Sequence, residues 1–196
     1  VRISTGSICK IHERISKILI KPYEEVRLHT LSQNHLNADE SSWKTMTLKR
    51  WIWIGHGKDS VFYSIKSSRS SEAFREVFGG FSGGLTTDRY AGYNSHQGSQ
   101  QLCWSHADRD FEKIALRGKA DKMIGDILLD CKTIVFNLWH KFKNDEINRQ
   151  ELIKLIEEGP KKDTELALKM SLIIEEVTNK TKATCLNFLN RYENLW

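Results

Sequence analysis

Apolar residues follow a helical spacing near the start of the chain. Isoleucine and leucine recur at three- and four-residue steps from Ile8 to Leu19. This spacing predicts a helix over residues 7–31, with Ser7 as its cap. Pro22 is expected to break that helix into two parts, because proline removes a backbone donor and clashes with the preceding turn.

The same spacing returns after His106 and continues to the end of the chain. These stripes of apolar residues cover positions 123–142, 152–156, 166–177 and 185–192. Stripes of this kind usually form the packed faces of helices. We therefore predict an all-helical second half with a shared apolar core.

Between the two helical parts, the pattern becomes that of β-strands. Aromatic and β-branched runs alternate with glycine-containing turns. The expected order is three strands, a helix and two strands, at residues 36–39, 50–55, 60–65, 70–77, 85–87 and 101–104. A helix between the third and fourth strands lets the fourth return parallel to the first and beside it. The fold class is therefore predicted as α/β.

The composition is typical of a globular protein, and it says little about which class of molecule the chain binds. Of its 196 residues, 39% are hydrophobic and 28% are charged, and the formal net charge is +5. No apolar run approaches the roughly 18 residues of a membrane span, so no membrane partner is expected. A modest basic excess favours a polyanion such as nucleic acid, but only weakly. The chain begins at Val1 without a signal-peptide pattern and stops at Trp196 without a polar tail, so we expect a fragment of a longer protein.

Two aspartates stand out because each lies at or near the end of a predicted strand. Asp39 follows the first strand and Asp88 follows the fourth. The predicted order would set these strands side by side, which would bring the two carboxylates together. Mg²⁺ prefers carboxylate oxygens, so the pair is a candidate metal site, against the simpler reading of turn or capping residues. Glu40 would point to the opposite face, as a surface residue or a support for the site.

Other polar residues carry weaker signals. Cys103 and His106 have a metal-like spacing, but no second pair completes a zinc site, which favours a buried strand thiol and a histidine at a helix start. Arg69 and Arg109 could contact phosphate or could simply be surface residues. The four cysteines lie far apart, which favours free buried thiols over disulfides.

Five blocks of sequence together resemble transposases of the insertion sequence 66 family, from about Ser4 to the end of the chain. The blocks are NADESSW at 37–43, WIWI at 51–54, SRS at 68–70, TDRYAGY at 87–93 and CWSHADR at 103–109. They occur in the family's order and spacing. This chain departs from the family at Ser41, where threonine is usual, at Arg89, where glycine is common, and at Asp108 and Asp110, where the family tends to be basic.

The resemblance implies a DNA transposase catalytic region with three acidic residues and a ribonuclease-H-like fold with a large all-helical C-terminal insertion. In it, Asp39 and Asp88 would be catalytic and would hold Mg²⁺ or Mn²⁺ in a two-metal arrangement. The enzyme would hydrolyse phosphodiesters at element ends and join the 3′-hydroxyl to target DNA. The third acid belongs to an "NN-x-x-E-R" segment that follows residues 187–196 in the family, so this chain alone is expected to be inactive. The family's N-terminal region, which would recognise DNA ends, is likewise expected to be missing from this fragment.

The resemblance also sets the expected domains and partners. Residues 1–34 would be a helical lead-in, 35–118 an incomplete catalytic core, and 119–196 a helical insertion. DNA would be the partner, with self-association possible, in a bacterial-type cytoplasm at the nucleoid. The alternatives are a noncatalytic DNA-binding or oligomerisation remnant of a transposase, or an expressed product with no function.

Overall fold

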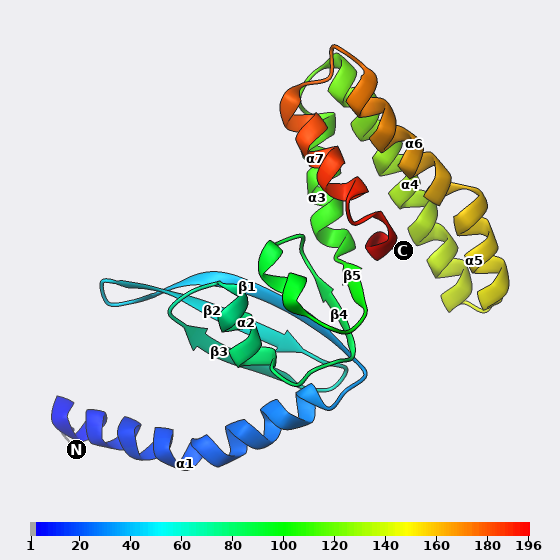
Figure 1. The fold of residues 1–196 in the computed structure, drawn as a ribbon. Coiled ribbons are helices and arrows are strands. Elements are labelled where there is room, and N and C mark those ends of the chain that lie inside the picture. The colour runs from blue at the N-terminus through cyan, green and yellow to red at the C-terminus, as the bar shows by residue number, and fades with distance from the viewer. Residues whose placement is uncertain (1–2) are drawn as a thin grey trace. The chain divides into compact units, whose positions relative to one another are not determined.

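The computed structural model describes residues 3–196 and divides the chain into two compact units (Figure 1). The first unit extends to Gln101 and contains most of the sheet, and the second extends from Leu102 to Trp196 and is helical. Helix α3 (Trp104–Ala115), which the sequence assigned to the catalytic core, belongs to the second unit. The domain boundaries predicted from the sequence stay predictions.

A mixed sheet forms the centre of the first unit. Within residues 3–196 its five strands have the order β3-β2-β1-β4-β5. Their bounds are β1 His35–Thr45, β2 Leu48–His56, β3 Val61–Lys66, β4 Gly84–Thr87 and β5 Gln100–Leu102. β1 and β3 are antiparallel to β2, whereas β4 is parallel to β1. The predicted order of elements is confirmed, as is the prediction that the first and fourth strands are parallel neighbours.

The core of the first unit lies between one face of the sheet and α2 (Ser71–Phe78). Trp53 is completely buried at its centre, with its ring 6.4 Å from that of Phe74 and 5.9 Å from that of Tyr93. Gly55 allows close packing here, because a Cβ at this position would lie 2.3 Å from the Phe62 ring. Aromatic burial on this face therefore fixes α2 against the strands.

Helix α1 (Thr5–Leu31) is continuous, so the predicted break at Pro22 is wrong. The helix bends instead of stopping (Figure 1), since proline costs one backbone hydrogen bond while good helix formers continue on both sides. The predicted cap is wrong as well: the side chain of Ser4 accepts a hydrogen bond from the backbone N–H of Ser7. A hydrogen bond connects the helix to the sheet, because the hydroxyl of Tyr23 donates to the carbonyl oxygen of Tyr63 at 2.9 Å.

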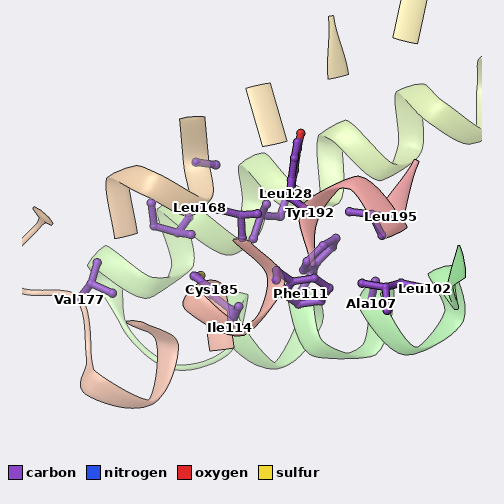
Figure 2. Packing of buried hydrophobic residues seen from close by; sticks show 13 residues of the cluster. Leu102, Ala107, Phe111, Ile114, Leu128, Leu168, Val177, Cys185, Tyr192 and Leu195 are labelled. Carbon is purple, nitrogen blue, oxygen red and sulfur yellow. The ribbon is translucent and has the colours of Figure 1, made fainter. Parts of the chain in front are cut away.

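The second unit is a bundle of helices, as its apolar stripes predicted. After α3 come α4 Lys119–Lys143, α5 Arg149–Glu158, α6 Pro160–Ile173 and α7 Asn179–Leu189. Figure 2 shows Phe111 and Ile114 facing Leu128, Leu168 and Cys185 in a shared core. The prediction of helix-on-helix packing is confirmed.

Two further predictions have outcomes in the fold. All four cysteines are free; Cys131 and Cys185 are buried, Cys103 is half-buried and Cys9 is exposed. None of the helices within residues 3–196 is long and apolar enough to cross a membrane.

Candidate active site

Asp39 and Asp88 lie at the same level, just beyond the pairing of the neighbouring parallel strands β1 and β4. The pairing of β1 with β4 ends at Asn37 and Thr86. Asp39 lies two residues beyond Asn37 within β1, and Asp88 lies two residues beyond Thr86, directly after β4. Because side chains alternate between the faces of a strand, Asp39 belongs to the same face of β1 as Asn37. The structure thus places the two predicted residues at the same end of the β1–β4 pairing.

Local hydrogen bonds orient each of these carboxylates. One oxygen of Asp39 accepts the backbone N–H of Glu40 at 2.9 Å. One oxygen of Asp88 accepts the backbone N–H of Tyr90 at 2.8 Å, which closes the turn after β4. Asp39 is exposed and Asp88 is half-buried, so solvent and ions can reach both residues.

Glu40 lies behind the pair, on the buried face of β1. Its side chain is only 2% exposed, and one of its oxygens lies 2.8 Å from a guanidinium nitrogen of Arg69. The other oxygen accepts a short hydrogen bond from the hydroxyl of Tyr93, which is completely buried. Glu40 therefore joins β1 to the segments before α2 and after β4. The sequence placed it on the correct face but could not show these partners.

The charges of this group act on one another. Burial raises the pKa of the Glu40 carboxyl above its ordinary value, and the negative charges of Asp88 and Asp39 add to that rise. The hydrogen bond from Tyr93 and the charge of Arg69 lower this pKa and offset part of the effect. Burial raises the pKa of Tyr93 as well, followed by its bond to Glu40. Asp39 and Asp88 are therefore both close enough to act on the Glu40 carboxyl.

Arg69, a predicted phosphate contact, has partners within the first unit. Its guanidinium carbon lies 3.6 Å from the ring centre of Tyr90 and 4.9 Å from that of Trp51. These contacts add cation–π attraction to the ion pair with Glu40. The side chain remains 36% exposed. Its binding to phosphate stays a prediction.

The remaining predicted residues belong to the second unit. Cys103 follows β5 and is the N-cap residue of α3, not part of a strand as predicted. His106 lies in the first turn of that helix, and its buried Nδ1 has no hydrogen-bond partner. Arg109 is exposed, and its Nε donates to the carbonyl oxygen of Ser105 at 3.2 Å. Asp108 forms an ion pair with Lys132 at 3.0 Å.

The residues present fit a hard divalent cation in part. Carboxylates that solvent can reach are the ligand type that Mg²⁺ and Mn²⁺ prefer, with water completing the coordination. Within residues 3–196, no three histidine, cysteine, aspartate or glutamate side chains gather in a way that could hold a metal ion. Metal binding by Asp39 and Asp88 therefore stays a prediction.

Comparison with known proteins identifies the class of this chain as a transposase. The family model described as "Transposase IS66 family" matches residues 1–195. The chain belongs to the IS66 family of transposases, as its five sequence blocks indicated. A search of curated proteins gave no match.

Glu40→Ala is expected to lower the free energy of unfolding of the first unit by about 3 kcal/mol. The loss leaves the buried Tyr93 hydroxyl without an acceptor, which costs about 1–3 kcal/mol, and removes the ion pair of a partly exposed Arg69. Glu40→Gln should cost less, since its amide oxygen can still accept from Tyr93. Urea unfolding measures both changes. Glu13→Ala, which removes an exposed pair with Lys17, is the control, and an equally small effect of Glu40→Ala would refute the supporting role.

Proposed function

We propose that this chain is the catalytic region of a DNA transposase, with a ribonuclease-H-like fold and with Asp39 and Asp88 as two of its three acids. The observation that carries the proposal is the position of the two aspartates just beyond the β1–β4 pairing, with Asp39 within β1 and Asp88 directly after the parallel strand β4. The strand order and directions support the proposed fold. Membership of the transposase family supports DNA as the substrate.

In this proposal the chain's own residues fix the geometry of the site. Asp39 is held by the β1 ladder, and Asp88 by its bond to the Tyr90 N–H. The neighbouring buried carboxylate of Glu40 forms the ion pair with Arg69 and accepts the hydrogen bond from Tyr93. These contacts reduce the freedom of the backbone that carries the site. A divalent ion held by the two aspartates would stabilise charge on phosphodiester oxygens during hydrolysis and strand transfer. The two-metal arrangement belongs to the proposal, and such an enzyme would work at the bacterial nucleoid.

The third acid of the proposed site is a glutamate in the family's "NN-x-x-E-R" block. No segment of the printed sequence matches that block. Catalytic groups that act as a unit lose most of their effect when one is missing. We therefore propose that the chain alone binds DNA and metal without cutting DNA.

An alternative is a noncatalytic DNA-binding or oligomerisation remnant of a transposase. One observation favours it: α1 exposes a row of isoleucines at helical spacing, which could form a partner surface. These residues are Ile8, Ile11, Ile15 and Ile18. This reading gives Asp39 and Asp88 no role in binding DNA.

The affinity for duplex DNA, measured with and without Mg²⁺ at constant ionic strength, tests the proposal. Wild-type chain should bind more tightly with Mg²⁺, because the ion can bridge the aspartates and a phosphate. The double variant Asp39→Asn, Asp88→Asn should lose this gain. If Mg²⁺ only weakens binding, equally in both proteins, the metal acts as a competing counterion and the noncatalytic reading is correct.

A further inference from the structure

The hairpin of β1 and β2 extends beyond the rest of the sheet as a two-stranded arm (Figure 1). We define this β1–β2 arm as residues 41–50. β3 pairs with β2 only from Trp51 onward, and β4 pairs with β1 only up to Asn37. Side chains from Ser41 to Lys49 are exposed, although the two strands stay fully paired down to the turn at Met46. The arm is therefore ordered but uncovered.

The arm is basic on both of its faces. Lys44 and Lys49 are directly opposite one another across the ladder, and Arg50 is opposite Trp43. Sequence positions 41–58 contain neither aspartate nor glutamate. Like charges placed opposite one another in a sheet repel, so the Lys44–Lys49 pair is unfavourable by itself. Among the described residues, no carboxylate forms an ion pair with either lysine. A polyanion would relieve this repulsion.

The tip of the arm adds exposed apolar side chains to this charge. Met46 is 94% exposed at the turn, and Leu48 and Trp43 are exposed beside it. Large apolar groups grouped at an exposed tip mark a contact surface more often than single ones do. Apolar contact with thymine methyl groups and sugars accompanies phosphate binding in many DNA complexes, and a two-stranded ribbon fits the major groove. Duplex DNA therefore matches both features of the arm.

The arm is also continuous with the candidate metal site. Asp39 and Trp43 lie on the same face of β1, because they are an even number of residues apart. Arg50, opposite Trp43, shares this face, whereas Lys44 and Lys49 lie on the other face of the arm. The seven residue-to-residue steps from Asp39 to Met46 span roughly 23 Å of extended strand. That reach is shorter than one turn of duplex DNA, about 34–36 Å. A duplex held at Asp39 would thus meet the arm within the same turn.

We propose that the β1–β2 arm binds duplex DNA next to Asp39 and Asp88, with Lys44, Lys49 and Arg50 on phosphates and the apolar tip in a groove. The inference rests on the proposed function, since it assumes that the same duplex reaches the two aspartates. The arm then determines where along the duplex the site acts.

Salt dependence of duplex binding tests the arm. The logarithm of the affinity falls as the logarithm of the salt concentration rises, and the double variant Lys44→Ala, Lys49→Ala should make this negative slope shallower by about 2. Each lost phosphate contact removes about 1 from its magnitude. The matched control is Lys141→Ala, Lys143→Ala on α4, which removes the same charge from exposed positions in the second unit. Its slope should equal that of the wild type. The unfolding midpoint of the control should equal that of the wild type. The midpoint of the arm variant should not fall below it, because the replaced side chains are exposed and the Lys44–Lys49 repulsion is removed.

The outcomes separate the arm from the proposed function. Equal slopes for the wild type and the arm variant would overturn the inference about the arm and leave the proposed function standing. Failure of the wild-type chain to bind duplex would overturn both. Sedimentation velocity provides the remaining check: if the arm variant loses self-association but keeps its slope, the arm joins copies of the chain and the inference is wrong.

Discussion

Asp39→Asn and Asp88→Asn are each expected to weaken Mn²⁺ binding by at least about a hundredfold. Residues that hydrogen-bond to a metal ligand, without touching the metal, already change metal affinity by about 10- to 100-fold when they are replaced. Loss of a ligand itself should cost no less. The substitution replaces an anionic oxygen with a neutral amide, which hard cations bind poorly. Electron paramagnetic resonance of free Mn²⁺ measures the affinity.

The fold of these variants should be unchanged. An asparagine side-chain oxygen can accept the same backbone hydrogen bonds, from Glu40 at position 39 and from Tyr90 at position 88. Asp145→Asn is the matched control, because Asp145 is exposed in the second unit and its backbone φ of 58° suits asparagine. This control should bind Mn²⁺ as the wild type does. A wild-type affinity in either site variant would remove that residue from the centre.

Trp53→Ala is expected to lower the free energy of unfolding of the first unit by about 3–5 kcal/mol. Trp53 is 0% exposed, and its ring has edge contacts with Phe78 and Tyr93. The substitution leaves a large cavity behind α2. It also removes the hydrogen bond that the indole nitrogen donates to the carbonyl oxygen of Ser68, at 3.3 Å.

Urea unfolding followed by circular dichroism measures this loss, and hydrogen exchange of β2 amides assigns it to the first unit. Trp43→Ala provides the comparison, since the exposed Trp43 should cost only about 0.5 kcal/mol. A similar cost for both substitutions would mean that Trp53 is not the centre of the core.

The arrangement of the sheet could be predicted because local signals marked each element. Runs of β-branched and aromatic residues marked the strands, and glycine-containing turns marked their ends. A helix before the fourth strand indicated that this strand returns parallel to the first and beside it. That order brought Asp39 and Asp88 to neighbouring strands. The length of β1 was underestimated, since its Ser-rich end carries no alternating pattern and forms a strand only through pairing with β2.

The role of Glu40 could not be predicted, because its partners are distant in sequence. Tyr93 lies 53 positions away, and only the fold brings its hydroxyl to the Glu40 carboxylate. The helix through Pro22 was missed for a different reason. The prediction considered only the local cost of proline, which is one lost backbone hydrogen bond and a steric clash with the preceding turn. A long helix can tolerate this cost by bending, as α1 does.

The most direct test of the proposed metal centre is a Mn²⁺ titration of the wild type, the two single variants Asp39→Asn and Asp88→Asn, and the double variant. If both aspartates hold one ion, either substitution destroys the centre, so the double variant loses no more affinity than each single variant. Additive losses would mean two independent sites, and an unchanged affinity in all three variants would mean none. Either result would contradict the assignment of Asp39 and Asp88 to one centre.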